Sequence, residues 1–356
     1  MKTLFLTGGG TAGHVSLNLA IIPELEKKGY AVHYIGSANS IEQELVQEYY
    51  PHVPFHSIST GKLRRYISVE NIKDPFKVVA GVGQSVQLML KHKPVAVFSK
   101  GGFVSVPVAL AAKLTNKPLV IHESDMSPGL ANKIASQFAK TVLTVFDTTA
   151  KHFPGKGLSV GPIIRPELFS GSRDKGLAQL GFTNELPVLL IMGGSQGSAK
   201  INQLVRETRM QLVESFQIIH LAGKGHVEVG EWSHPNYRIF EFVTDDLSDF
   251  LATTDFIISR AGSNAIFEFL ALQKPMYLIP LSKKASRGDQ VENAHYFVKK
   301  GYAVMTEEDL LTAEEFTNAI QELVSRQEEI RSKQQQAASS PSPVAFVSLL
   351  EEQFKK

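Results

Sequence analysis

The sequence contains no cysteine, which excludes disulfide bonds, thiolate catalysis and cysteine-ligated metal sites. It also lacks an apolar run near the roughly 20 residues that a membrane-spanning helix needs. Neither sign of charge dominates, since 37 Lys and Arg face 35 Asp and Glu for a formal net charge of +2. This balance gives no reason to expect a nucleic-acid partner. The first residues enter an apolar strand pattern without a signal-like segment, so we expect a cytoplasmic protein.

The length of the chain predicts two domains. At 356 residues it exceeds the size at which single cores stop growing, and 43% hydrophobic residues can fill two cores. Short apolar runs alternate with helix-compatible segments, which predicts α/β domains with doubly wound parallel sheets. Two prolines within residues 161–166 favour a linker there. We therefore predict domains at 1–161 and 162–340, with residues 341–356 forming a helix that packs back towards the first domain.

Two glycine-rich stretches have the same local design. Residues 8–14, GGGTAGH, follow the apolar run Leu4–Leu6, and residues 193–197, GGSQG, follow Val188–Met192. Glycines allow tight turns and expose backbone N–H groups beside a helix N-terminus, where a phosphate is stabilised. The repetition predicts two Rossmann-like domains that face one another across a central cleft, with the active site in that cleft.

A dinucleotide-binding oxidoreductase is the first alternative. Gly8, Gly10 and Gly13 satisfy the pattern G-x-G-x-x-G, but that pattern expects an acid about 20 residues further on. The second predicted strand ends Ile35-Gly36-Ser37-Ala38, without an acid. The Walker pattern of nucleotide hydrolases is missing as well. The remaining alternative for the first loop is a glycine turn that only joins a strand to a helix.

Residues 260–268, RAGSNAIFE, form the most informative acid-containing stretch. Small residues at a helix start favour a pyrophosphate, and Glu268 lies about one and a half turns further along. A carboxylate there can accept both hydroxyls of a ribose. Gln290 and Asn293 share one face of the next helix and could bind polar groups of the same ligand. The competing interpretation of each is a solvated side chain on a helix surface.

Taken together and in order, the motifs resemble the MurG family of N-acetylglucosaminyltransferases, which complete the lipid-linked disaccharide-pentapeptide precursor of bacterial peptidoglycan. The resemblance extends from near the N-terminus to about residue 294. It rests on GGTAGH at 9–14, GGFVS at 101–105, HE at 122–123, GGSQG at 193–197, RAG at 260–262 with Glu268, and DQ at 289–290 with Asn293. It implies the GT-B fold and inverting transfer of GlcNAc from UDP-GlcNAc to the 4-hydroxyl of undecaprenyl-pyrophosphoryl-MurNAc-pentapeptide.

The resemblance also implies roles for individual residues. Glu268 would bind the uridine ribose, Gln290 the sugar, and Val243 the uracil through its backbone. Further substrate-binding residues by this resemblance are Thr11, Ala12, Gly13, Asn132, Arg165, Ser195, Ser263, Asn264 and Ala265. This chain has Ala12 where the family commonly has glycine, and Ser124-Asp125 where it often has Gln-Asn.

Transfer to a hydroxyl requires a base, and His14 is the leading candidate because imidazole has a suitable pKa and lies on the loop that would meet the acceptor. Glu123 and Asp125 are the alternatives for the base, and His14 could instead only stabilise its loop. Helix N-termini and Arg165 could stabilise the leaving UDP. Since neither Asp-x-Asp nor a His-rich cluster occurs along the sequence, no metal or cofactor is predicted. The rival functions are a UDP-GlcNAc 2-epimerase and a non-catalytic sugar-nucleotide sensor.

A polyprenyl-linked acceptor would require contact with the membrane. The predicted helix from Asp74 to Lys91 places Phe76 and Val79 on one face, with Lys77 nearby. Apolar side chains flanked by cations suit an anionic membrane surface. The alternative is that Phe76 and Val79 pack into the core. We expect a peripheral protein on the cytoplasmic face of the cell membrane, where other cell-wall synthesis proteins are further candidate partners.

Overall fold

The structure is a computed structural model, and it describes residues 2–11, 13–61, 70–194, 197–227, 232–337 and 340–355, with the backbone alone at 70–73. Contacts divide the chain into two compact units. Unit 1 comprises Met1–Ile163 together with Pro341–Lys356, and unit 2 comprises Ile164–Ser340. Among the described residues, no helix is both long and apolar enough to cross a membrane.

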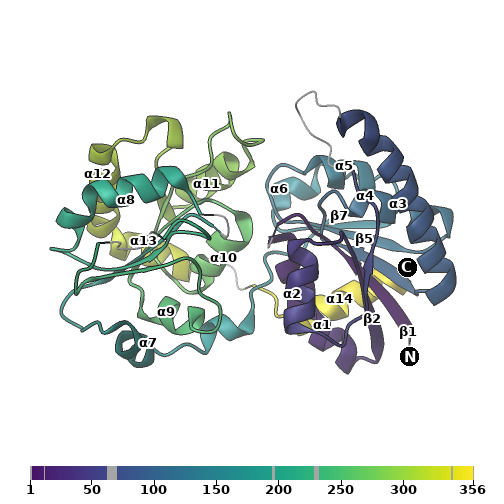
Figure 1. The fold of residues 1–356 in the computed structure, drawn as a ribbon, viewed down its shortest axis with the longest axis horizontal. Coiled ribbons are helices and arrows are strands. Elements are labelled where there is room, and N and C mark those ends of the chain that lie inside the picture. Colours follow the sequence, from purple (N-terminus) through teal and green to yellow (C-terminus); the bar gives the residue numbers. More distant parts are fainter. Residues whose placement is uncertain are drawn as a thin grey trace. The chain divides into compact units, whose positions relative to one another are not determined.

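Unit 1 contains a seven-stranded parallel sheet in the order β3-β2-β1-β4-β5-β6-β7 (Figure 1). The strands are β1 (Lys2–Thr7), β2 (Tyr30–Gly36), β3 (Phe55–Ser57), β4 (Ala96–Ser99), β5 (Leu119–Glu123), β6 (Thr141–Thr144) and β7 (Gly157–Ser159). The helices are α1 (Gly13–Lys27), α2 (Ile41–Tyr49), α3 (Glu70–His92), α4 (Ser105–Leu114), α5 (Leu130–Ala135), α6 (Asp147–Ala150) and α14 (Pro343–Lys355).

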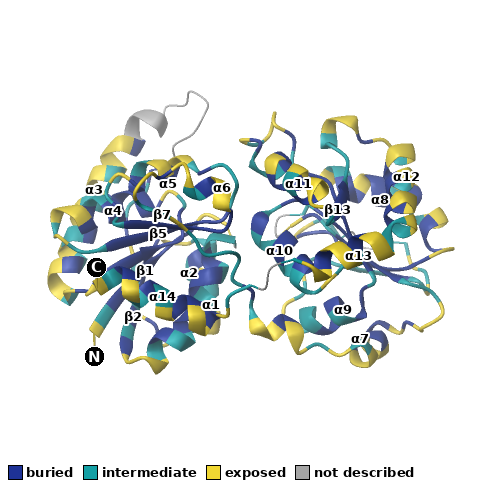
Figure 2. Cartoon of the chain, turned by 180° about the vertical axis from the view of Figure 1, so that it is seen from behind, coloured by how far each residue is buried: buried dark blue, intermediate teal, exposed yellow. Residues whose placement is uncertain are grey.

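Helices cover both faces of this sheet, as the alternating pattern predicts. Alternate residues of β1 divide between two cores: Leu4 and Leu6 pack with α1, α2 and α14, whereas Phe5 packs with α3, α4 and α5. Strands β4, β5 and β6 are buried from end to end, and the exposed residues lie mainly on the outer sides of the helices (Figure 2). The strands can therefore be apolar on both sides, which explains their continuous apolar runs.

The C-terminal helix α14 belongs to the core of unit 1. Phe346 is buried and its ring lies 5.8 Å from that of Phe98 in β4. At the other end of the helix, Glu351 forms an ion pair with Lys28 and accepts a hydrogen bond from the Tyr30 hydroxyl at 3.0 Å. Residues far apart in the sequence thus complete one sheet face.

Unit 2 contains a six-stranded parallel sheet in the order β10-β9-β8-β11-β12-β13. The strands are β8 (Val188–Met192), β9 (Gln217–Leu221), β10 (Tyr237–Phe240), β11 (Phe256–Ser259), β12 (Met276–Leu278) and β13 (Ala303–Met305). The helices are η1 (Pro166–Phe169), α7 (Arg173–Leu180), α8 (Ala199–Leu212), α9 (Leu247–Thr253), α10 (Ser263–Ala271), α11 (Asp289–Lys299), η2 (Glu308–Leu310), α12 (Ala313–Ser325) and α13 (Gln327–Gln335).

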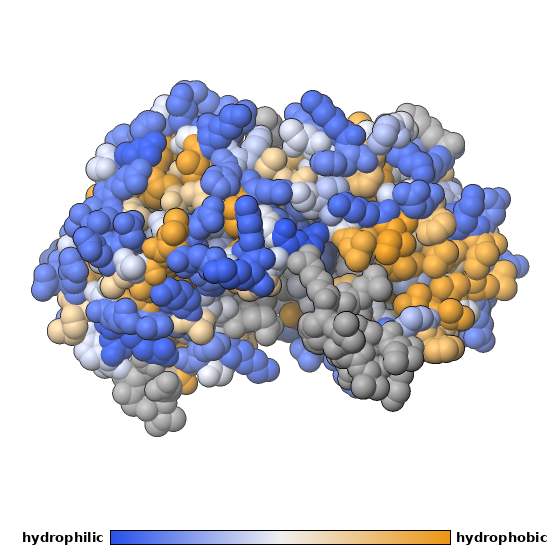
Figure 3. All heavy atoms as spheres, turned by 90° about the horizontal axis from the view of Figure 1, so that it is seen from above, coloured by the Kyte–Doolittle hydropathy of each residue, from blue (hydrophilic) through white to orange (hydrophobic). Residues whose placement is uncertain are grey.

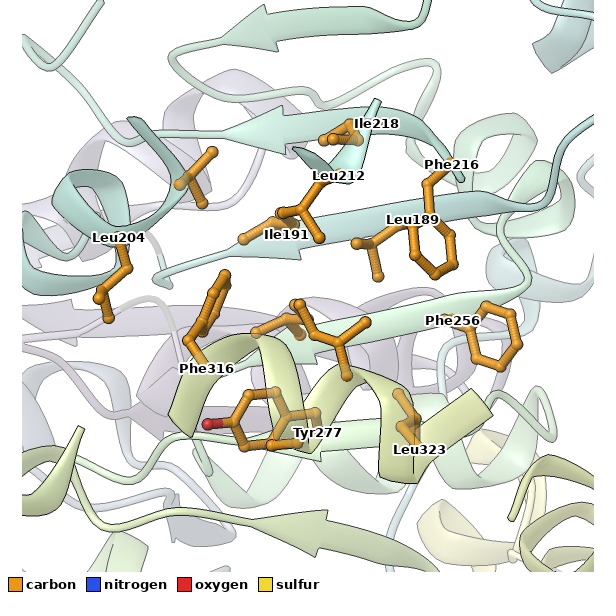
Figure 4. Close-up of a cluster of buried hydrophobic side chains, with 14 of the residues drawn as sticks. Leu189, Ile191, Leu204, Leu212, Phe216, Ile218, Phe256, Tyr277, Phe316 and Leu323 are labelled. Carbon is orange, nitrogen blue, oxygen red and sulfur yellow. The ribbon is translucent and has the colours of Figure 1, made fainter. Parts of the chain in front are cut away.

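One face of the unit 2 sheet is covered by α8 and α12. Figure 4 shows Phe316 and Leu323 of α12 in the same buried cluster as Tyr277 and as Leu189 of the central strand β8. The close fit of aromatic and aliphatic side chains fixes both helices on the sheet. The start of α8 is thereby held at the carboxyl end of β8.

The expected fold class is confirmed: both units are Rossmann-like, doubly wound parallel sheets. The Gln-rich stretch that follows Lys333 is helical at first, because α13 continues to Gln335. Its Gln334 is buried and donates hydrogen bonds to the carbonyls of Lys274 and Tyr302 at 2.9 and 3.0 Å. A Gln-rich composition therefore does not exclude a helix, and this helix is held on the sheet by the buried amide of Gln334.

Candidate active site

Each sheet reverses its strand order at one point, between β1 and β4 in unit 1 and between β8 and β11 in unit 2. The loops that leave the carboxyl ends of those two strands run to opposite faces of the sheet and leave a crevice, which is where open α/β sheets bind ligands. Both predicted glycine loops lie at such a point, since one follows β1 and the other follows β8. The fold therefore makes these loops the candidate site of each unit.

In unit 1 the loops after β1 and β4 are in direct backbone contact. The amide of Gly9 donates to the carbonyl of Gly101 at 3.2 Å. Gly102 has a φ of +86°, and a Cβ there would lie 2.2 Å from the Gly9 carbonyl oxygen. A side chain at Gly102 would therefore push the two loops apart, which explains the GG at 101–102.

Glu42 is a functional candidate that the sequence analysis missed. Its buried carboxylate, in the first turn of α2, accepts hydrogen bonds from the amides of Gly10 at 3.1 Å and Ser37 at 3.0 Å. In a dinucleotide-binding enzyme an acid at the end of β2 lies beside the glycine loop and binds a ribose. Here the acid beside the loop is Glu42 of α2. The carboxylate fixes the loop instead of binding a ribose.

His14 lies in the first turn of α1 and turns back over the glycine loop. Its Nδ1 lies 3.0 Å from the carbonyl oxygen of Gly9 and 3.1 Å from Oγ1 of Thr11. A carbonyl can only accept, so this hydrogen bond assigns the proton of the neutral ring to Nδ1 and the lone pair to Nε2. One nitrogen orients the ring, and the other has the electronic form of a general base.

Glu123 ends β5 and is buried with both oxygens engaged. Oε1 accepts from the amide of Asp125 at 3.0 Å, and Oε2 accepts from the amide of Gly129 and the side chain of Asn132, both at 2.9 Å. The Asn132 amide also donates to the carbonyl of His122 at 3.2 Å. This geometry makes Glu123 and Asn132 a scaffold for the loop after β5, and it favours His14 over Glu123 as the base.

Lys100 is a buried cation directly beneath these loops. It follows β4, its side chain is buried, and its Nζ has no hydrogen-bond partner among the described residues. Burial lowers the pKa of the Lys100 ammonium, whereas the nearby carboxylates of Glu123 and Asp125 raise it. Burial also holds the pKa of His122 well below its usual value, with Lys100 acting in the same direction. The acidic residues of this loop therefore face an internal positive charge.

In unit 2, Arg260 connects the two loops at the switch point. Its guanidinium donates to Oγ of Ser198, the N-cap of α8, at 2.7 Å and to the carbonyl of Ile279 at 3.1 Å, and it pairs with Glu308. Because Arg260 itself directly follows β11, it ties the start of α8 to the loop that begins α10. This contact places two helix N-termini, both suited to an anion, at the same edge of the sheet.

Glu268 forms a bidentate ion pair with Arg165. Arg165 Nε lies 2.9 Å from Oε1 and Nη2 lies 3.2 Å from Oε2, while the Glu268 side chain is only 14% exposed. The pairing brings two residues 103 positions apart into one site, and it excludes the interpretation of Glu268 as a solvated glutamate. Each carboxylate oxygen keeps a second lone pair, so the pair can still accept from hydroxyls.

The other residues predicted to bind the sugar nucleotide differ in their surroundings. Ser263 begins α10 and is buried, with Asn264 and Ala265 beside it in the same turn. The oxygen of Gln290 accepts from the amide of Leu281 at 3.0 Å, so Gln290 orders the loop after β12. Asn293 is also structural here, since its buried amide donates to the carbonyl of Ala261 at 3.2 Å.

Val243 lies in the loop between β10 and α9, and its side chain is half-buried. Thr11 is exposed, and Gly13 begins α1 beside His14. Ala12 and Ser195 fall outside the described residues.

Comparison with known proteins agrees with the fold. The model of the glycosyltransferase family 28 N-terminal domain matches residues 4–144, and that of the C-terminal domain matches residues 188–348. Among solved structures, MurG of Acinetobacter baumannii superposes with a TM-score of 0.77 at 25% identity, covering 99% of this chain and 100% of that one. A calicheamicin glycosyltransferase superposes with a TM-score of 0.72 at 14% identity, which shows the fold alone.

These features define a two-domain glycosyltransferase of the GT-B fold. The chain belongs to glycosyltransferase family 28. It is 50% identical over 355 residues to the UDP-N-acetylglucosamine–N-acetylmuramyl-(pentapeptide) pyrophosphoryl-undecaprenol N-acetylglucosamine transferase of Oceanobacillus iheyensis, covering 99% of both chains. It is 49% identical to the enzyme of the same name from Staphylococcus saprophyticus, covering 93% of this chain and 92% of that one.

The first prediction concerns Glu42. In Glu42→Gln the new amide group faces backbone donors, so the glycine loop loses about 1–3 kcal/mol of stabilisation, and glycosyl transfer falls roughly 10–100-fold. Glu44→Gln, on the exposed side of the same helix, serves as the control and keeps its rate. Steady-state transfer assays, with circular dichroism to verify folding, provide the measurement. A folded Glu42→Gln with normal turnover would show that the loop needs no carboxylate.

Proposed function

We propose that this protein transfers GlcNAc from UDP-GlcNAc to the 4-hydroxyl of undecaprenyl-pyrophosphoryl-MurNAc-pentapeptide. The observation that carries the proposal is the N-terminus of α10, with the Arg165–Glu268 pair in its second turn. The backbone amides and the dipole at a helix start suit a pyrophosphate, and a fixed carboxylate one and a half turns away suits a ribose. The near full-length identity of 50% to transferases of that name supports the choice of donor and acceptor.

Unit 2 would hold the donor. The pyrophosphate would lie at Ser263, Asn264 and Ala265, and the two ribose hydroxyls would donate to the remaining lone pairs of Glu268. Arg165 keeps the carboxylate in place and adds a positive charge that stabilises the leaving diphosphate. Ser195, Gln290 and Val243 are the proposed contacts to the diphosphate, the sugar and the uracil.

The reaction would be a single displacement with inversion. The acceptor hydroxyl oxygen attacks C1 of GlcNAc, its proton passes to Nε2 of His14, and the bond from C1 to the phosphate oxygen breaks to release UDP. The hydrogen bond from Nδ1 to Gly9 prepares this step, because it orients the ring and favours the imidazolium that forms. Asp125 is the remaining alternative base, since Glu123 is buried among its hydrogen-bond donors. Thr11, Ala12 and Gly13 remain proposed substrate-binding residues.

The surface of α3 supports a peripheral position at a membrane. Phe76 and Val79 are 75% and 70% exposed, so the alternative that they pack into the core is wrong. Figure 3 shows apolar residues gathered on this face of unit 1. Lys77 lies between them and its Nζ is 3.5 Å from a carboxylate oxygen of Asp74. Lys62, Arg64 and Arg65, which precede this helix in the sequence, lie outside the described residues. An anionic membrane is the partner that suits exposed apolar side chains beside cations.

The proposed function is tested by the fate of radiolabelled GlcNAc. With UDP-GlcNAc and a lipid-linked muramyl acceptor, we expect label in the lipid product and UDP release only when acceptor is present. A UDP-GlcNAc 2-epimerase would change the donor without a lipid, and a sensor would bind it without turnover. Either result would overturn the proposal.

The second prediction concerns the ribose contact. Glu268→Ala removes charged acceptors worth roughly 1.5–3 kcal/mol, so UDP should bind about 10–150-fold more weakly. Isothermal titration calorimetry with UDP measures the change, and Glu314→Ala, an exposed glutamate of α12, provides the control. Unchanged UDP affinity in folded Glu268→Ala would remove this residue from the donor site.

The third prediction concerns the base. His14→Ala should lower turnover about 10²–10⁴-fold while UDP affinity stays within twofold, because Nε2 would act on the acceptor and not on the donor. Single-turnover transfer and calorimetry separate the two effects. Near-normal turnover would restrict His14 to its loop-stabilising contact with Gly9 and would direct attention to Asp125.

The fourth prediction concerns the membrane. Phe76→Ser with Val79→Ser should keep UDP binding and thermal stability, because both side chains are exposed. It should reduce sedimentation with anionic vesicles and activity on a long-chain acceptor, but not on a short-chain soluble analogue. Met210→Ser, which changes an exposed apolar residue of α8 in unit 2, is the matched control. Vesicle binding equal to wild type would place the docking surface elsewhere.

A further inference from the structure

Three histidines outside the proposed reaction meet on one face of the unit 1 sheet. His33 lies in the middle of β2, His56 in the middle of β3, and His92 is the last residue of α3. His56 pairs with Ile35, two residues beyond His33, so both strand side chains point to the same face. The end of α3 covers that face and adds the third ring.

The ring nitrogens of these three residues converge. One nitrogen from each lies within 4.8 Å of the other two, and Nδ1 of His33 is 2.9 Å from Nε2 of His56. Around a tetrahedral zinc with bonds of about 2.0–2.1 Å, ligand nitrogens lie roughly 3.3 Å apart. To share one ion, the His92 ring therefore needs to approach the other two by at most about 1.5 Å, and the hydrogen-bonded nitrogens of His33 and His56 need to separate by about 0.4 Å.

Hydrogen bonding alone leaves this cluster incomplete. The contact between His33 and His56 engages one nitrogen of each, but Nε2 of His92 is buried and has no hydrogen-bond partner among the described residues. Buried polar atoms are nearly always bonded. Phe5 closes the inner side of the cluster, with its ring 5.7 Å from that of His33 and 6.0 Å from that of His92. A cation at the centre would satisfy Nε2 of His92, for which the described residues offer no partner.

The type of ligand indicates which metal ions fit the cluster. Three imidazoles without a carboxylate ligand favour zinc, copper or nickel over magnesium or calcium.

We propose that His33, His56 and His92 bind one transition-metal ion, best matched by Zn²⁺, with water in the fourth position. Such an ion would fasten the outer strands β2 and β3 to the C-terminal end of α3. The proposed role is structural, because α3 carries the exposed Phe76 and Val79 at its other end and must hold its place on the sheet. The proposal does not depend on the identity of the transferred sugar.

The test uses the full chain without a histidine tag, stripped by a chelator and titrated with Zn²⁺ alone against a chromophoric competitor. We expect one ion per chain, and an unfolding midpoint of unit 1 that rises by about 5 °C or more at a hundredfold excess over Kd. Co²⁺ in place of Zn²⁺ should give the intense visible absorption of a four-coordinate site. Binding of less than one ion per chain, or no rise in the midpoint, would overturn the proposal.

Variants identify the ligands. His92→Gln and His56→Gln each remove a ligand from a different element, and each should weaken Zn²⁺ binding at least about a hundredfold. His52→Gln is the matched control, because His52 is an exposed histidine of the same unit that contacts Glu26. Both ligand variants should lose Zn²⁺ affinity, and in chelator each should melt close to the wild-type midpoint. This combination separates the loss of a ligand from misfolding. Zn²⁺ affinity that is unchanged in both would show that the cluster is only a packing of rings.

Discussion

The close approach of the backbone loops after β1 and β4 is the constraint on which the unit 1 site depends. A parallel sheet brings the carboxyl ends of all its strands to one edge, and the reversal of strand order leaves one gap there. Gly9 and Gly102 meet in that gap at a distance that no side chain would permit. His14 takes its orientation from the same contact, because its Nδ1 binds the carbonyl of Gly9.

Charged side chains around the proposed site act mainly on the protein itself. Glu42 and Glu123 are buried and accept hydrogen bonds from backbone amides, while Arg260 donates to the N-cap of α8 and to a carbonyl. Buried carboxylates are costly unless they are bonded, and here each bond fixes a loop. His14 in unit 1 and the pair of Arg165 and Glu268 in unit 2 are the groups that we propose for chemistry and binding.

Helix α3 has an exposed apolar first half and a last residue that packs among aromatic rings. Its first half presents Phe76 and Val79 to solvent. A helix that only covers a hydrophobic core usually has polar side chains on its solvent side. The last residue of α3, His92, packs into an aromatic cluster with Phe5 and two other histidines. If the exposed first half of α3 contacts a membrane as proposed, the proposed ion would hold the other end of the helix on the sheet.

The sequence by itself determined the fold class and the location of the loops. Continuous apolar strands such as Val188–Met192, each followed by a glycine turn and a helix, can be buried only in a parallel sheet with helices on both faces, so local pattern sufficed. It also placed Glu268 correctly on the second turn of α10. These features depend on residues that are neighbours along the chain.

Contacts between distant residues were decided only by the tertiary structure. Neither the partner of Glu268, Arg165, nor the acid beside the first glycine loop, Glu42, has a signal in local spacing, because the chain path between the partners is long and irregular. Periodicity could not decide whether Phe76 and Val79 face the core or water, since an amphipathic helix shows the same period either way. The three histidines belong to separate strands and a helix, so no sequence spacing reveals that one sheet face brings them together.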